Sequence, residues 1–344
     1  MTSEVSRKSS AGTFLLLGFV LLLLSGAYVI FAPNAGEVGS GKFLYIRTGS
    51  TINDLTGQLE AGGYVRSVGT FKLLASAAGL DKHIRPGKYQ VSRGMSNYKL
   101  VRMLRSGHQT PVKLVINKVR TKRDFVQLVC NNLEADSNQL YRLLDDDKLL
   151  ASYHLSSETA LCAVLPDSYE FFWNTPADKV FKKIAANYHA FWNPARRAKV
   201  EARHLTVAQV VTVASIVEEE TNVAEDKPLI ASVYLNREAK GMKLQADPTV
   251  KFAIGDFTIR RVTGAMLSYP SPYNTYLNYG LPPGPICTPL PETIDAVLDA
   301  PETKNLYFCA KADFSGRSAF AVTFDEQKKN AAAYQHALNE RGIK

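Results

Sequence analysis

The longest apolar stretch of the chain lies close to its N-terminus. Residues 11–32 carry no charged side chain and are about as long as a helix that crosses a bilayer. Arg7 and Lys8 precede them, which favours a cytoplasmic N-terminus and an exported remainder. Small residues around Ala27 offer a signal-peptide cleavage site as the alternative, but the apolar run continues through Phe31. We predict a cytoplasmic tail at 1–10, an uncleaved transmembrane helix at 11–32 and a flexible linker at 33–41.

Short alternating patterns and capped helical patterns follow. Strands are predicted at 43–47 and 88–92, and helices opening within 49–54, at 70–78 and after Ser96. This alternation predicts a small α/β subdomain over 42–111. From residue 112 to 344 the pattern predicts a larger mixed α/β domain. It begins with a strand at 112–116, is mostly helical over 121–204, and ends with a hairpin at 305–310 and 319–324 and a helix from Asp325. The fold class is therefore predicted to be α+β.

One helix in the larger domain organises the rest. Thr206 and Gln209 form a capping-box pattern that predicts a helix over 207–221. A rotation of about 100° per residue places Glu218 at the end of an apolar stripe, while Glu219 shares a polar sector with Thr212 and Ser215. Desolvation among Val and Ala side chains raises a carboxyl pKa, which keeps an acid protonated near neutral pH. We therefore predict Glu218 as the acid and Glu219 as an ionised, solvent-facing residue. A solvated helix end is the alternative interpretation.

Composition and charge narrow the classes of partner. The net charge of +9 is spread along the 344 residues, so no nucleic-acid site is predicted, and attraction to anionic lipid or wall polymer explains the charge more simply. Four cysteines have no paired spacing, so neither a metal site nor a cofactor is predicted. Up to two disulfides and buried free thiols both remain open for these cysteines, which are Cys130, Cys162, Cys287 and Cys309.

Several motifs occur in one order after this helix begins. They are Ile216 to Thr221 (I-V-E-E-E-T), 231–237 (A-S-V-Y-L-N-R), 241–250 (G-M-K-L-Q-A-D-P-T-V), 273–276 (Y-N-T-Y) and 280–286 (G-L-P-P-G-P-I). In order and spacing they resemble the endolytic murein transglycosylases of the MltG (YceG-like) family. The resemblance implies a LysM-like fold for 42–111 and a YceG-like catalytic domain for 112–344. The chain departs from the family at 161–164, before the Pro166-Asp-Ser-Tyr169 segment, and at Ser318 and Gln327, where the family usually carries histidines.

The resemblance also implies which residues form the site. A lytic transglycosylase needs one dominant carboxyl, and we assign Glu218 as acid and then base. Glu220 is assigned as a nearby polar residue or second acid, although helix rotation turns it away from Glu218. Pro248 favours a loop that presents Gln245 and Asp247. The Pro- and Tyr-rich segment 269–288 suits one wall of a saccharide cleft. The remaining candidate substrate-binding residues are Asn236, Asn274 and Tyr276.

The implied activity is cleavage of the bond between N-acetylmuramic acid (MurNAc) and N-acetylglucosamine (GlcNAc) in nascent peptidoglycan strands. The products carry 1,6-anhydroMurNAc ends, and elongation of the strand stops. The implied place is the cytoplasmic membrane, with glycan strands as substrate and peptidoglycan synthases as candidate partners. Two alternatives stay open: an inverting muramidase in which Asp247 activates water, and a membrane-anchored scaffold that binds the wall without catalysis.

Overall fold

The chain divides into two compact units. The computed structural model describes residues 6–36 and 42–342. Unit 1 comprises Met1–Lys113, Asn132–Glu134 and Glu170–Thr175, and unit 2 comprises Leu114–Asn131, Ala135–Tyr169 and Pro176–Lys344. The main division therefore falls two residues after the predicted one, and two short segments return to unit 1. Strands β3 (Val112–Ile116) and β4 (Asp167–Phe171) form a two-stranded sheet, and the chain changes from one unit to the other within each strand.

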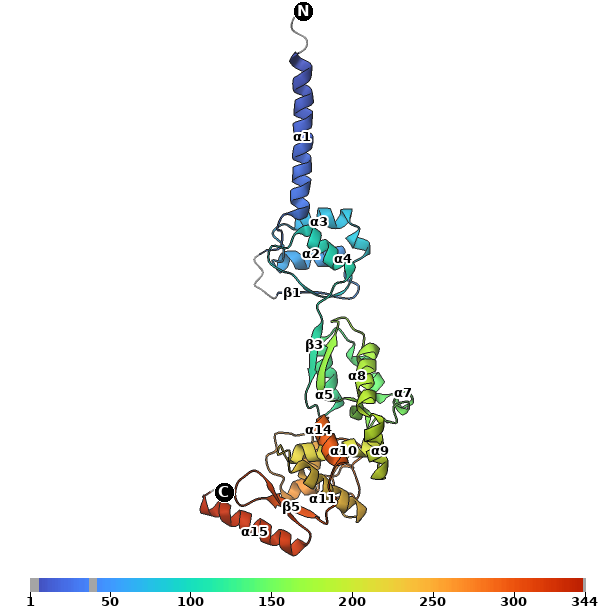
Figure 1. The fold of residues 1–344 in the computed structure, drawn as a ribbon, viewed down its shortest axis with the longest axis vertical. Coiled ribbons are helices and arrows are strands. Elements are labelled where there is room, and N and C mark those ends of the chain that lie inside the picture. The colour runs from blue at the N-terminus through green and yellow to red at the C-terminus, as the bar shows by residue number, and fades with distance from the viewer. Residues whose placement is uncertain (1–5, 37–41, 343–344) are drawn as a thin grey trace, which may run out of the picture. The chain divides into compact units, whose positions relative to one another are not determined.

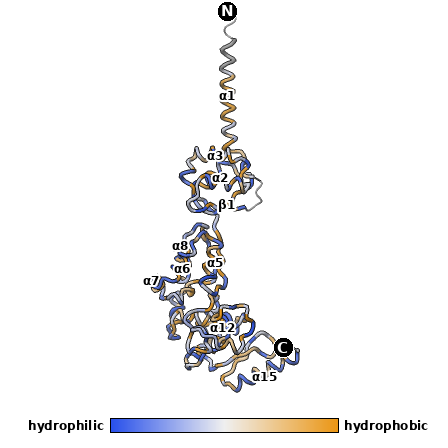
Figure 2. The backbone as a smooth tube through the Cα atoms, turned by 180° about the vertical axis from the view of Figure 1, so that it is seen from behind, coloured by the Kyte–Doolittle hydropathy of each residue, from blue (hydrophilic) through white to orange (hydrophobic). Residues whose placement is uncertain are grey.

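Helix α1 (Ser6–Phe31) is the first element of unit 1 (Figure 1). Its segment Gly12–Phe31 is 20 residues long and apolar enough to cross a membrane. At 1.5 Å per residue it extends about 30 Å, which is the thickness of a bilayer's hydrocarbon core. None of this segment is buried within the protein, and the chain is strongly apolar along it (Figure 2). The apolar helix predicted at 11–32 is therefore present.

The rest of unit 1 is a small α/β module. Its elements, in chain order, are β1 (Phe43–Ile46), α2 (Ile52–Ala61), α3 (Val68–Ala77), a 3₁₀ turn η1 (Leu80–Lys82), β2 (Gly87–Gln90) and α4 (Asn97–Ser106). Strands β1 and β2 pair antiparallel, with Phe43 opposite Gln90 and Ile46 opposite Gly87. Alternation along β1 directs Leu44 and Ile46 into a core that α2, α3 and α4 complete. The side chains of Thr51, Ser67 and Ser96 cap the three helices.

The segment after α1 corrects one prediction. Residues 33–36 are packed onto unit 1 and do not form a flexible linker. The backbone amides of Asn34 and Ala35 donate to the Met95 carbonyl at 3.1 and 2.9 Å, and Ala35 is fully buried. The Asn34 side chain also donates to Asn97 Oδ1 at 2.6 Å. Backbone polar groups that are satisfied in this way hold a short segment in place. Residues 37–41, the remainder of the predicted linker, lie outside the described residues.

Unit 2 is mainly helical and contains the last hairpin. Its elements are α5 (Lys122–Asn132, whose last residue counts with unit 1), α6 (Ser137–Asp145), α7 (Asp147–Ala151), the 3₁₀ turn η2 (Ala160–Ala163), α8 (Ala177–Phe191), α9 (Pro194–Ala202), α10 (Val207–Glu220), α11 (Lys227–Ala239), α12 (Asp247–Ile254), α13 (Gly264–Leu267), α14 (Pro291–Leu298), β5 (Tyr307–Ala310), β6 (Ser318–Ala321) and α15 (Phe324–Glu340). Strands β5 and β6 pair antiparallel, and α15 packs against both. The α+β class is confirmed.

Helix α10 is the centre of unit 2. The predicted capping box is present at Thr206 and Gln209, and α9, α11, α12 and α14 pack around the helix. Every residue from Val210 to Glu218 is buried, so the predicted solvent-facing polar sector is wrong. The hydroxyls of Thr212 and Ser215 donate instead to the backbone carbonyls of Ala208 and Thr212, at 2.8 and 2.7 Å. A helix surrounded by others on all sides buries polar residues when their hydroxyls find such local partners.

Candidate active site

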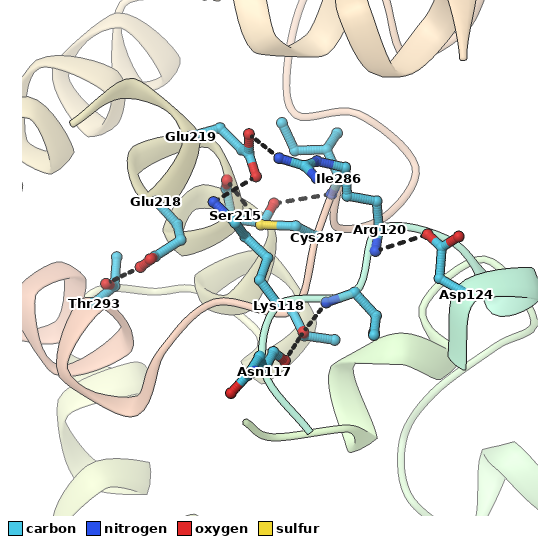
Figure 3. A network of polar contacts seen from close by, with 12 residues as sticks. Asn117, Lys118, Arg120, Asp124, Ser215, Glu218, Glu219, Ile286, Cys287 and Thr293 are labelled. Carbon is cyan, nitrogen blue, oxygen red and sulfur yellow. Dashed lines mark hydrogen bonds and ion pairs between the residues drawn. The ribbon is translucent and has the colours of Figure 1, made fainter. Parts of the chain in front are cut away.

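Three adjacent glutamates end α10, and the structure places their carboxyl groups in three different environments. The helix ends at Glu220, and the backbone of Thr221 is extended. Glu218 points toward Thr293 and Glu219 points toward Lys118 and Arg120 (Figure 3). The three carboxyl groups therefore have different partners and different chemistry.

Glu218 lies in a buried ion pair. Its Oε2 is 3.0 Å from Nζ of Lys227, the first residue of α11, and it accepts a hydrogen bond from the Thr293 hydroxyl of α14. Lys227 Nζ also donates to the Thr293 hydroxyl at 2.6 Å. The side chain of Glu218 is only 8% exposed. Glu218 is buried at the end of α10, as predicted, but the apolar stripe does not account for its charged partner Lys227. The Glu218 carboxyl thereby joins three helices.

Glu219 is ionised, as predicted, but it does not face water. Its carboxylate forms ion pairs with Lys118 and Arg120, both at 2.9 Å, and its side chain is 17% exposed. Burial raises the pKa of Glu219, but the hydrogen bonds from Arg120 and Lys118 outweigh burial, so that the pKa lies below its ordinary value. Both basic residues come from the segment between β3 and α5.

Glu220 has the environment that suits a general acid. The Tyr234 hydroxyl of α11 donates to its Oε1 at 2.7 Å, and the residue is partly exposed. The pKa of Glu220 is raised to about 7. Burial of the carboxyl is the largest cause and the nearby carboxyl of Asp247 adds to it, while Tyr234 and Lys251 act in the opposite direction. A carboxyl transfers protons most efficiently when its pKa lies near the pH at which the enzyme works. Helix rotation predicts only that Glu220 turns away from Glu218, and it gives no sign of this environment.

Asp247 and Tyr276 lie together beside Glu220. The Tyr276 hydroxyl donates to Asp247 Oδ1 at 2.6 Å. Asp247 interacts electrostatically with Glu220, and Tyr276 interacts in the same way with Tyr234. Asp247 is exposed and begins α12, so the prediction that Pro248 places it in a loop is wrong; proline is well tolerated in the first turn of a helix. Gln245, just before it, is exposed, adopts a positive φ of 51° and donates its backbone amide to the Thr275 carbonyl.

The two candidate asparagines have structural partners. The Asn236 side chain donates to the carbonyls of Thr303 and Asn305 at 2.9 and 3.0 Å, and thereby holds α11 to the segment before β5. Asn274 is fully buried; its side-chain amide donates to the carbonyls of Leu267 and Tyr269, and its Oδ1 accepts from the Tyr276 amide. Asn274 thus fixes the loop that carries Tyr276. Both side-chain amides therefore have backbone partners, and a role of Asn236 or Asn274 in sugar binding stays a prediction.

The Pro- and Tyr-rich segment 269–288 contains no helix or strand, as predicted. Tyr269 and Tyr279 of this loop are 41% and 70% exposed, so their rings are available for stacking. A hollow of about 430 Å³ lies beside Tyr273 and Pro285 of this loop. Its lining includes Arg120, which pairs with Glu219, and Phe252. The ring of Phe252 packs at a tilt against that of Tyr273, with ring centres 4.7 Å apart. The hollow therefore combines aromatic and basic side chains.

Ser318 and Gln327, where the chain departs from the expected family pattern, also have hydrogen-bond partners within the fold. The Ser318 amide donates to buried Asp226 at 2.5 Å, and the Gln327 side chain donates to the Phe308 carbonyl at 3.0 Å. All four cysteines are free thiols, which settles the alternative left open by the sequence.

Sequence reasoning missed the partners of the glutamates. Tyr234 and Lys251 influence Glu220, Lys227 pairs with Glu218, and Lys118 and Arg120 pair with Glu219. The alternation of basic residues directly after a predicted strand is the one signal that points to Lys118 and Arg120. Tyr234 belongs to the I-A-S-V-Y segment, where its position on a helix face suggested only packing.

A carboxyl with a raised pKa, hydrogen-bonded to a tyrosine and with a second carboxyl beside it, is the arrangement expected of an acid–base site. It lies on an α+β fold that has an apolar N-terminal helix. The model of the YceG-like family matches residues 44–333, and the chain belongs to this family. It is 25% identical to the endolytic murein transglycosylase of Bacillus subtilis (strain 168), over 93% of each chain. The same identity relates it to the endolytic murein transglycosylase of Streptococcus pneumoniae serotype 2, over 92% of this chain and 64% of the relative.

The fold has a counterpart among solved structures. The crystal structure of a YceG-like protein from Listeria monocytogenes superposes with a TM-score of 0.57 at 26% sequence identity. The match covers 85% of this chain and 99% of that one.

Proposed function

We propose that this protein is an endolytic lytic transglycosylase that cleaves the MurNAc–GlcNAc bond within peptidoglycan strands and leaves 1,6-anhydroMurNAc ends. The relatives named endolytic murein transglycosylase support the reaction class, because one of them aligns over 93% of both chains. Within this chain the proposal rests on one observation: the pKa of the Glu220 carboxyl is raised to about 7 while the residue remains partly exposed.

Glu220 performs both proton transfers in this proposal. The protonated carboxyl gives its proton to the oxygen between C1 of MurNAc and C4 of GlcNAc, and the C1–O bond breaks. The resulting carboxylate then takes the proton of the MurNAc C6 hydroxyl, and the oxygen of that hydroxyl bonds to C1. Glu220 ends protonated, as it began, and no water is consumed. The Tyr234 hydroxyl, which donates to Glu220 Oε1, stabilises the carboxylate formed between the two transfers.

The surroundings of the two other glutamates argue against the earlier choice of Glu218. The carboxyl of Glu218 is held by Lys227 and Thr293 and is only 8% exposed, so a polymeric substrate has little access to it. Glu219 is occupied by two cations. We therefore transfer the role of acid and base to Glu220. Asp247, Tyr276 and Gln245 remain the proposed contacts to sugar, and Tyr269 and Tyr279 provide exposed rings.

The apolar helix α1 gives the proposed location. We infer that α1 anchors the protein in the cytoplasmic membrane with its N-terminus inside, because Arg7 and Lys8 flank the start of the span. The remainder of the chain then works on the outer side of that membrane, where glycan strands are polymerised. Cleavage there ends the growth of a strand.

The test is mass spectrometry of muropeptides after the full-length protein, in detergent, has been incubated with uncrosslinked glycan strands. Wild type yields anhydroMurNAc ends, and Glu220→Gln loses them by at least about 10⁴-fold, because one residue serves two transfers that are each worth roughly 10²–10⁴. Glu219→Gln is the matched control and keeps most of the activity. Glu218→Gln, assayed below its unfolding temperature, also forms anhydro ends.

Three results would contradict the proposal. Anhydro ends formed by Glu220→Gln at more than about a hundredth of the wild-type rate would place the acid elsewhere. Reducing MurNAc ends from wild type would identify a hydrolase, in which Asp247 is placed to activate water beside the acid. Glycan binding without any new ends, unchanged in Glu220→Gln, would identify a scaffold.

A further inference from the structure

The C-terminal end of α1 is fixed to the rest of unit 1 by specific contacts. The Asn97 side chain of α4 donates to the Val29 carbonyl of α1 at 2.9 Å. The rings of Phe31 and Tyr98 lie 5.8 Å apart, and Pro33 forms a bridge with Ser96. Both α3 and α4 pack against α1, and α3 lies beside its C-terminal end (Figure 1). If α1 spans the bilayer, the face of unit 1 around this junction lies at the bilayer surface.

This face, which we call the α3/α4 patch, is apolar and basic. It consists of Leu73, Tyr98, Arg102 and Arg105. Tyr98 and the two arginines line a hollow of about 600 Å³ between the two helices, together with Leu74 and Ala77 of α3. Leu73 and Tyr98 are 66% and 45% exposed, and both arginines are exposed. Leu73 lies one turn before Ala77, which lines the hollow, so it shares that side of α3. Within residues 6–36 and 42–342, no carboxylate lies within 4.0 Å of either guanidinium group.

With α1 across a bilayer, this patch falls at the level of the lipid headgroup layer. The apolar span ends at Phe31, and the headgroup layer adds about 5–7 Å on each side of the hydrocarbon core. Tyr98, which contacts the Phe31 ring, therefore lies within that layer, where tyrosine is favoured. Arg102 follows Tyr98 by one helical turn, or about 6 Å along α4. Arginine pairs with phosphate through two parallel hydrogen bonds.

We propose that the α3/α4 patch binds anionic phospholipid headgroups of the membrane that holds α1. Leu73 and Tyr98 enter the boundary between headgroups and acyl chains, and Arg102 and Arg105 bind the lipid phosphates. Unit 1 is thereby held on the bilayer surface and does not swing freely at the end of its anchor. The charge of the patch and the exposure of its apolar residues suit this ligand. The inference rests on the proposed anchoring by α1, so its test reports on the two separately.

The test uses full-length protein with Leu73→Trp in vesicles that contain phosphatidylcholine and phosphatidylglycerol in a fixed ratio. In one preparation only the phosphatidylglycerol chains are brominated, and in the other only the phosphatidylcholine chains. Wild type, with its two native tryptophans, provides the background to subtract. Quenching of the added tryptophan is expected to be stronger with brominated phosphatidylglycerol. About fivefold local enrichment is expected for each arginine that binds lipid, which corresponds to about 1 kcal/mol.

The double variant Arg102→Glu and Arg105→Glu should abolish this preference. The matched control is Arg47→Glu with Lys113→Glu, which changes the net charge equally at exposed positions of unit 1 next to β1 and within β3, and it should retain the preference. Equal quenching by both lipids would refute selective binding of anionic lipid, and no quenching above wild type would refute contact with the bilayer. Failure of the protein to float with vesicles would instead refute the anchor.

Discussion

Glu220→Gln should make this protein more stable at alkaline pH while it removes activity. A carboxyl whose pKa is raised on folding costs stability once the pH exceeds its pKa in the unfolded chain, since the unfolded state releases the proton more easily. For Glu220 the two values are 4.5 and about 7, so the cost grows between them and is constant above pH 7. It amounts to about 3 kcal/mol at pH 8 and under about 1 kcal/mol at pH 5. Glutamine avoids the cost, because its amide oxygen still accepts the hydrogen bond from Tyr234.

The assay is urea unfolding of the full-length protein in detergent at both pH values. The free energy of unfolding of Glu220→Gln should exceed that of wild type by at most about 3 kcal/mol at pH 8, and the two should nearly coincide at pH 5. A gain of this size raises the midpoint of thermal unfolding by roughly 6–10 °C in a unit of this length. A gain that does not change with pH, or no gain at pH 8, would refute the raised pKa and with it the reason for choosing Glu220.

The neighbouring positions should respond differently. Glu218→Gln should lower the free energy of unfolding by about 3 kcal/mol, because buried Lys227 loses its charge partner; Lys227→Met added to it should recover part of the loss in urea unfolding, and additive losses would contradict the pair. Glu219→Gln should be destabilising at pH 8, and its deficit should shrink as the pH falls through the carboxyl range, because the pKa of Glu219 is lowered on folding. In the pH profile of kcat/KM, activity should fall above about pH 7 as Glu220 loses its proton. Tyr234→Phe should move that limb to higher pH, because the hydroxyl lowers the pKa of Glu220; an unmoved limb would show that another group titrates.

Local features of the chain could be predicted from the sequence, because they depend on residues close to one another. The apolar span of α1, the capping box at Thr206 and Gln209, and the order of strands and helices in unit 1 all follow from composition and periodicity. The same applies to the final hairpin and α15. The order of motifs also indicated the family, which the match over residues 44–333 confirms.

The choice among the three glutamates required the tertiary structure. Helix rotation gives the direction in which each side chain leaves α10, but it does not show which groups other segments bring there. Lys227 and Thr293 arrive from α11 and α14 and occupy Glu218, whereas Tyr234 and Asp247 arrive from α11 and α12 and surround Glu220. Periodicity also assumes one solvent-facing side, whereas α10 is buried on every side from Val210 to Glu218. A carboxyl pKa depends on burial and on charges within a few ångströms, and those are set by packing between segments distant in the sequence.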